Sequence, residues 1–99
     1  MADRPITWSK IASRQLEAAI NYIALDSIQS AEKVRKDILE KILKLPAYPE
    51  IHSLDKFKII NDGSYRAFEL HRYRVAYRVT KNEILIFRVR HTSREVLRY

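Results

Sequence analysis

The chain has 99 residues and a formal net charge of +7, with 46% hydrophobic and 31% charged residues. This length predicts one domain with a single core over residues 1–99 and excludes a multidomain enzyme. The absence of cysteine excludes a disulfide scaffold, a thiolate metal site and a cysteine nucleophile. The three histidines lack metal-ligand spacing and one glycine cannot form a phosphate-binding loop, so we expect no metal and no cofactor.

The positive charge is concentrated in the second half of the chain. Residues 1–55 carry eight Lys and Arg against eight Asp and Glu, whereas residues 56–99 carry eleven against four. Eight of those eleven cations are arginines, which pair bidentately with phosphate and stack on bases. The distribution predicts a polyanion or an acidic protein segment as partner.

The sequence shows no sign of a membrane protein. No apolar run approaches the ~20 residues that a bilayer crossing needs, and the first residues lack the apolar stretch of a signal peptide. We therefore expect a cytoplasmic protein with no membrane partner.

The first half of the chain predicts a short strand and two helices. Arg4 to Trp8 contains a proline with β-branched and aromatic residues, which is typical of an edge strand. Helical spacing then runs from an N-cap at Ser9 to about Leu25, and again from Asp26, where Gln29 completes a pattern resembling a capping box. The apolar stripes are Ala12, Leu16, Ala19, Ile20 and Ile23, then Ala31, Val34, Ile38, Ile42 and Leu45. Pro46 ends the second helix, and such a pair forms an antiparallel hairpin with one apolar face to bury.

After a loop over residues 46–55 the apolar period becomes two, which predicts strands. We place them at residues 56–60, 64–70, 72–80 and 83–91. The Asn61-Asp62-Gly63 and Lys81-Asn82 segments indicate hairpin turns, because glycine tolerates the positive φ of a primed turn.

Side-chain alternation assigns two faces to the expected sheet. In residues 72–80 we expect one set of side chains to point to the core, namely Tyr73, Val75, Tyr77 and Val79. The alternate set points away from the core and consists of Arg72, Arg74, Ala76 and Arg78. In the next strand Leu85, Phe87 and Val89 are expected on the packed face, with Arg88 and Arg90 beside the other arginines. The fold class is thus α+β, with an N-terminal short strand and an antiparallel two-helix hairpin packed on a curved antiparallel sheet of about four to five strands.

Several short strings, in this order and spacing, carry a resemblance over nearly the whole chain. They are Trp8-Ser9, Tyr22-Ile23, Leu45-Pro46-Ala47-Tyr48-Pro49-Glu50, Tyr65-Arg66-Ala67-Phe68, Tyr73-Arg74-Val75-Ala76-Tyr77-Arg78-Val79 and residues 84–94. Together they resemble the RelE/ParE superfamily of bacterial toxins from type II toxin–antitoxin modules, which include plasmid stabilisation proteins.

The resemblance implies two alternative activities. RelE-like members are ribosome-dependent mRNA endonucleases (mRNA interferases) that need no metal, whereas ParE-like members inhibit DNA gyrase and have lost the nuclease residues. The long helix hairpin resembles ParE, while the sheet arginines and a tail ending in Tyr99 resemble RelE. The partners implied are a cognate antitoxin with an acidic or amphipathic segment, together with either the ribosome and mRNA or gyrase. A catalytically inactive, basic nucleic-acid-binding relative is a further alternative.

Cleavage of RNA by its own 2′-hydroxyl requires a proton acceptor, cations at the phosphate and an acid for the leaving oxygen. The resemblance places Arg74 on the scissile phosphate and Arg66 where RelE-like enzymes carry a lysine. Phe68 replaces their second lysine, which weakens the nuclease reading. His91, with an ordinary pKa of about 6.5, suits general acid or base catalysis, although alternation also allows it to cap the core. Arg94 falls near the C-terminal catalytic arginine of the family.

Six further cations and one tyrosine are predicted to bind nucleic acid. They are Lys56, Lys58, Arg72, Arg78, Arg88, Arg90 and Tyr99. The two lysines have an alternative role, since lysines on an edge strand protect against aggregation. Arg72 and Arg78 have an alternative role as partners of antitoxin carboxylates. We expect Tyr73, Tyr77 and Phe87 in the core, because aromatic residues at strand spacing usually pack there.

Overall fold

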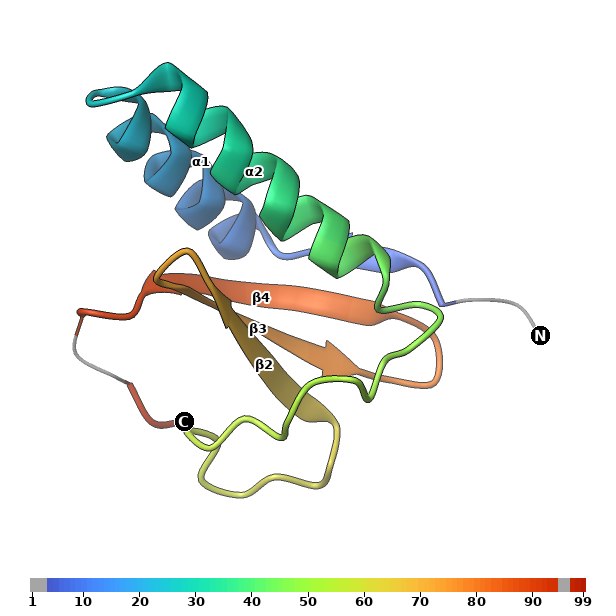
Figure 1. Ribbon diagram of the computed structural model, residues 1–99. Helices are drawn as coiled ribbons and strands as arrows, with labels where there is room; N and C mark the ends of the chain where they lie inside the picture. Colours follow the sequence, from blue (N-terminus) through green and yellow to red (C-terminus); the bar gives the residue numbers. More distant parts are fainter. Residues whose placement is uncertain (1–3, 95–96) are drawn as a thin grey trace.

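A helix hairpin lies on one face of a four-stranded sheet (Figure 1). The elements in chain order are β1 (Ile6–Trp8), α1 (Lys10–Ala24), α2 (Ile28–Leu43), β2 (Tyr65–Leu70), β3 (Tyr73–Val79) and β4 (Ile84–His91). The computed structural model describes residues 4–94 and 97–99. The predicted α+β class, with its helix hairpin packed on a sheet, is confirmed. Within the described ranges no helix has the length and apolarity to span a membrane.

The strand order in the sheet is β1-β4-β3-β2. Strands β2, β3 and β4 pair antiparallel, whereas β1 pairs parallel to β4, with Ile6 opposite Ile84 and Trp8 opposite Ile86. The sheet is therefore mixed, not antiparallel throughout as predicted. Parallel neighbours need a long connection, and here both helices and two strands separate β1 from β4 in the chain.

Serine side chains begin both helices. Ser9 accepts a hydrogen bond from the backbone N–H of Ala12 at 3.0 Å. In α2 the N-cap is Ser27, which accepts from the N–H of Ser30 at 3.1 Å. Our assignment of Asp26 as this cap was wrong, because the N–H of Asp26 still donates to the carbonyl of Ile23 in the last turn of α1.

The core lies between the helix hairpin and the sheet. All five stripe residues predicted for α2 are buried, as are four of the five predicted for α1, with Ile23 packed at the edge of the core. Tyr77 is fully buried and its hydroxyl donates to the carbonyl of Pro49 at 3.1 Å, so the sheet also fixes the loop after α2. Burial raises the pKa of Tyr77 to about 12.

The strand predicted at residues 56–60 is absent. The carboxylate of Asp55 accepts from the N–H of Phe57 at 3.1 Å, and the N–H of Lys58 donates to the carbonyl of Asp55 at 3.2 Å. These bonds bend the backbone into a turn, which prevents it from extending. The Asn61-Asp62-Gly63 segment consequently joins a turn to β2 and does not close a hairpin, although Gly63 does adopt a positive φ of 96°.

The turn between β2 and β3 consists of His71 and Arg72, with φ values of 53° and 67°. Leu70 and Tyr73 pair across it, as in a type I′ hairpin. Arg72 is therefore a turn residue and does not belong to the strand in which we predicted it. The turn predicted at Lys81-Asn82 is confirmed, because the N–H of Thr80 donates to the carbonyl of Glu83 at 2.9 Å.

A β-bulge changes which residues of β4 face the core. Val75 pairs with Val89 and Ala76 with Arg88, but Tyr77 pairs with Ile86, so Phe87 is left without a partner in β3. Ile84 and Ile86 are fully buried along with Val89. Leu85 and Phe87 are only half-buried, and the prediction that they join the packed face was wrong. Because the bulge adds one residue to β4, the alternation of inward and outward side chains is reversed in the part of β4 that precedes it.

Candidate functional site

The face of the sheet that the helices leave open carries aligned arginines. In the register of β3 and β4, Arg74 lies opposite Arg90 and Ala76 lies opposite Arg88. Arg78 follows Ala76 on the same face of β3. We call the residues Arg74, Arg78, Arg88 and Arg90 the arginine face. Their predicted placement on one face is confirmed by this register.

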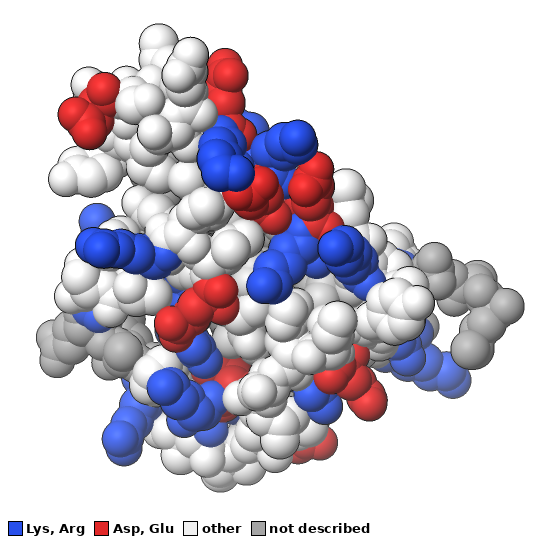
Figure 2. All heavy atoms as spheres, in the orientation of Figure 1, with Lys and Arg blue, Asp and Glu red and all other residues white. Residues whose placement is uncertain are grey.

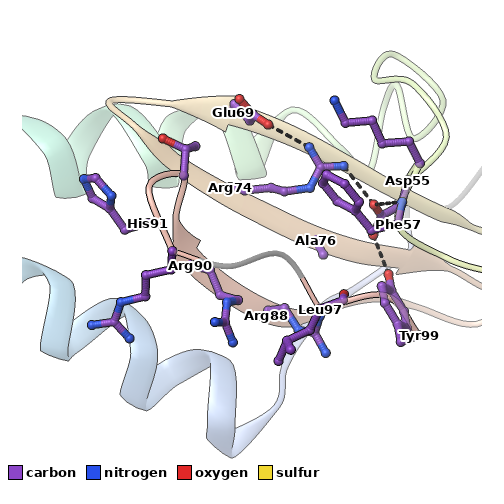
Figure 3. A pocket seen from close by; sticks show the side chains of 13 residues that line it. Asp55, Phe57, Glu69, Arg74, Ala76, Arg88, Arg90, His91, Leu97 and Tyr99 are labelled. Carbon is purple, nitrogen blue, oxygen red and sulfur yellow. Dashed lines mark hydrogen bonds and ion pairs between the residues drawn. The ribbon is translucent and has the colours of Figure 1, made fainter.

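A cavity of about 240 Å³ opens on the arginine face (Figure 3). Its lining comes from the loop after α2, strands β2 to β4 and the end of the chain, and consists of Asp55, Lys56, Phe57, Glu69, Arg74, Ala76, Arg88, Arg90, His91, Thr92, Arg94, Leu97 and Tyr99. Among these described residues five are Lys or Arg and two are Asp or Glu. The cavity is therefore cationic overall, but it contains acids that sequence patterning did not reveal.

Arg74 is held between two carboxylates. Its guanidinium donates to Asp55 at 2.8 Å and to Glu69 at 2.8 Å. It also lies 4.6 Å from the ring centroid of Phe57, which is a cation–π contact. The Arg74 side chain is 19% exposed and that of Asp55 is 2% exposed, so this ion pair is largely out of water.

Asp55 connects Arg74 to the end of the chain. Its second oxygen accepts a hydrogen bond from the hydroxyl of Tyr99. Burial alone acts to raise the pKa of Asp55, but hydrogen bonds from Tyr99, Arg74 and the Phe57 N–H outweigh it, so the net pKa is below the ordinary value. For Tyr99, burial first and the Asp55 carboxylate second raise the pKa of the hydroxyl.

The ring of Tyr99 lies among aromatic and cationic side chains. The ring centroids of Tyr65 and Phe87 are 5.9 and 5.6 Å from it, both in edge-on geometry. The ammonium of Lys58 and the guanidinium of Arg88 lie 5.1 and 4.8 Å from the Tyr99 centroid. Phe87 is thus part of this cluster and not of the core, contrary to our prediction, because the bulge turns it outward.

Arg66 lies on the other face of the sheet. In the register of β2 and β3, Arg66 lies opposite Tyr77, whose side chain is in the core. Glu69 lies opposite Arg74, on the arginine face. The guanidinium of Arg66 donates to the carbonyl of His52 at 2.7 Å, and its buried Nε has no hydrogen-bond partner among the described residues. The structure therefore does not bring Arg66 together with Arg74.

His91 lies at the opposite end of the cavity from Tyr99 (Figure 3), and Arg94 also lines the cavity. Figure 3 shows the imidazole of His91 turned away from Arg74. The ring contacts Tyr73 edge-on at 5.1 Å, and its Nδ1 accepts from the N–H of Ser93 at 3.1 Å. Arg94 is exposed, and its N–H donates to the His91 carbonyl at 3.1 Å. Both residues also line a second cavity, of about 470 Å³, between α1 and the sheet.

The other predicted nucleic-acid-binding residues are spread around this site. Lys56 lines the cavity, while Lys58 lies 4.8 Å over the ring of Tyr65. Arg72 is exposed in the β2–β3 turn, away from the lining. Arg78 stacks on Tyr65 at 4.8 Å and donates from Nε to the Ser64 hydroxyl at 3.1 Å. Of the predicted set, the structure gathers Lys56, Arg74, Arg88, Arg90, His91, Arg94 and Tyr99 around one cavity.

Sequence reasoning missed Asp55, Phe57 and Glu69. Asp55 and Phe57 belong to an irregular loop, part of which we predicted as a strand at residues 56–60. For Glu69 a signal did exist, because alternation in β2 places it opposite the side that carries Phe68. On α2, Lys33 pairs with Asp37 and Lys36 with Glu40. Figure 2 shows basic and acidic side chains mixed over the helix hairpin. Among the described residues no three potential ligands gather to hold a metal ion.

Comparison with known proteins gives both a family and a fold. Residues 6–96 match the family described as "ParE toxin of type II toxin-antitoxin system, parDE". No curated protein matches the chain. Among solved structures, a chain of the "Chromosomal ParDE TA system from P. aeruginosa" is 22% identical, with a TM-score of 0.70 over 91% of this chain and 97% of its own. The YoeB dimer from Staphylococcus aureus is also 22% identical, with a TM-score of 0.55 over 87% of this chain and 93% of its own.

Proposed function

The chain belongs to the ParE toxin family of type II toxin–antitoxin systems, and we propose that it inhibits DNA gyrase by binding and does not cut mRNA. It is the toxin of such a module, and membership implies a cognate antitoxin as partner. The ParE-like branch of the superfamily, which acts on gyrase without nuclease residues, is the branch that the matched family names.

The environment of Arg74 is the observation that carries this proposal. A nuclease would need this guanidinium to stabilise the negative charge that develops on the phosphate. Here two carboxylates already accept hydrogen bonds from two of its nitrogens, and one of these carboxylates is buried. An entering phosphate would have to displace these carboxylates from Arg74, and removing Asp55 from Arg74 would leave a buried charge unpaired.

The position of Arg66 supports the same conclusion. A cleavage site needs its proton-transfer group and its phosphate-binding cation within hydrogen-bond reach of one phosphodiester. Arg66 extends from the helix-covered face of the sheet and donates to the loop carbonyl of His52. Arg66 therefore stabilises that loop and does not lie on the face that carries Arg74.

The cavity nevertheless suits binding to an acidic protein surface. Its five cations exceed its two acids, and Arg88 and Arg90 come from adjacent positions on one face of β4. Arginine with aromatic neighbours is the composition found at the energetic centres of protein interfaces. We assign gyrase binding to this surface.

The test measures gyrase and translation in parallel. Purified toxin is expected to block supercoiling by gyrase and to leave mRNA intact in a translation extract. Arg88→Ala is expected to raise the inhibitory concentration about ten-fold, in the range found when an interface arginine is truncated. Arg14→Ala is the matched control, because Arg14 is an exposed arginine on α1 outside the cavity lining.

A ribosome-dependent endonuclease is the second candidate, because His91 and Arg94 line the same cavity as Arg74. If mRNA is cut only when ribosomes are present, and Arg74→Ala abolishes the cleavage, the endonuclease becomes the favoured function over gyrase inhibition. Expression that is harmless without an antitoxin would instead favour an inactive nucleic-acid-binding relative.

A further inference from the structure

The last described residues, 97–99, pack back onto the loop that follows α2. The N–H of Tyr99 donates to the carbonyl of Phe57 at 3.0 Å, and the N–H of Ile59 donates to the carbonyl of Tyr99 at 2.5 Å. One residue thus exchanges both of its backbone groups with the segment 57–59, in the manner of paired strands. Chain ends are usually ordered only where such bonds fix them.

The side chain of Tyr99 is satisfied within the chain. Its hydroxyl donates to the buried carboxylate of Asp55, and hydrogen bonds to charged groups are among the stronger ones. Its ring has edge-on contacts with Tyr65 and Phe87 and lies beside two cations. A nucleobase or a partner's aromatic side chain would have to compete with these groups for the ring.

The same residues cover part of the arginine face. The guanidinium of Arg88 stacks on Tyr99 at 4.8 Å and donates to the carbonyl of Leu97 at 3.3 Å. Arg88 is therefore engaged by the end of the chain. A ligand that needs Arg88 can pair with it fully only after these contacts break.

We propose that residues 97–99 form a C-terminal clasp that closes part of the arginine face, with Tyr99 as its internal plug. The plug role replaces the sequence-based expectation that Tyr99 is a stacking platform for nucleic acid. Opening of the clasp makes Arg88 available to an anionic ligand. This inference does not depend on gyrase as the target, because it concerns access to the surface.

The decisive variant is Tyr99→Phe, which removes the hydroxyl and keeps the ring. Tyr99→Ala removes both, and Tyr48→Phe is the matched control, because Tyr48 is a 64% exposed tyrosine on the loop after α2. The first measurement is amide hydrogen exchange at Ile59 and Tyr99. Loss of a hydrogen bond to a carboxylate is expected to speed exchange at both amides about ten-fold or more, while the amides of β3 stay protected.

The second measurement is the affinity for a labelled hexa-adenylate, which offers both phosphates and stacking bases. The clasp predicts about three-fold tighter binding by Tyr99→Phe and Tyr99→Ala than by the wild type and Tyr48→Phe, because Arg88 becomes available. A stacking platform predicts weaker binding by Tyr99→Ala and no change for Tyr99→Phe. That pattern would overturn the proposal, and so would unchanged exchange at Ile59 in Tyr99→Phe, whatever the hexa-adenylate does.

Discussion

The carboxylate of Asp55 and the guanidinium of Arg74 lie 2.8 Å apart, although they are 19 positions apart in the chain. This pair joins the irregular loop after α2 to the centre of the sheet, on the side away from the helices. The same carboxylate also accepts the hydrogen bond from the Tyr99 hydroxyl.

Asp55→Asn is expected to destabilise the protein by about 3 kcal/mol, because it removes one charge of a largely buried pair. The control is Glu69→Gln, which removes the other carboxylate on Arg74. The Glu69 side chain is 50% exposed, so its loss is expected to cost less than about 1 kcal/mol. Urea unfolding measures both, and equal losses would contradict the inferred difference in burial.

The Asp55 carboxylate also predicts a pH dependence of stability. Its pKa in the folded state is below the ordinary value, so its contribution is complete above the unfolded-state pKa of about 3.9 and is lost as the pH falls through the lower folded-state value. The free energy of unfolding is therefore expected to fall with decreasing pH below about 4, and more steeply in the wild type than in Asp55→Asn. Urea midpoints measured between about pH 2 and 6 test this, and parallel profiles would refute it.

We expect Arg66 to contribute to the stability of the folded protein. Arg66→Lys keeps the charge but loses the fixed fork that reaches the His52 carbonyl, so we expect a loss of about 1–2 kcal/mol. The same substitution at Arg72, exposed in the β2–β3 turn, is expected to stay within about 0.5 kcal/mol. Thermal or urea unfolding decides. A toxin that keeps its full stability but loses its activity in Arg66→Lys would restore a catalytic role for this residue.

The beginning of α2 offers a matched pair of neighbours. Ser27→Ala is expected to cost about 1 kcal/mol, because the Ser27 hydroxyl accepts from the N–H of Ser30. Asp26→Ala is expected to change the free energy of unfolding by only a few tenths of a kcal/mol. The reverse order in urea unfolding would show that Asp26 caps the helix after all.

Local pattern was sufficient to locate both helices and all four strands, although it also predicted a strand at residues 56–60 that is absent. The stripes of α1 and α2 repeat at helical spacing, and each stripe needs only its own neighbours to be recognised. Alternation likewise assigned Tyr73, Val75 and Tyr77 to the core and Arg74 to the other face. The family resemblance also came from local strings, and the match over residues 6–96 confirms it.

The contents of the site depended on tertiary contacts. Asp55 reaches Arg74 only because an irregular loop folds over the sheet, and no period in the sequence encodes the path of such a loop. One bulged residue in β4 exchanged Phe87 for Ile86 in the core. The sequence by itself therefore determined the layers of the molecule and the abundance of arginine on one of them, because these follow from periodicity and composition. Only the tertiary structure decided which arginines are paired with acids, which one lies on the far face and which one the clasp covers, because such pairings form between residues distant in the chain.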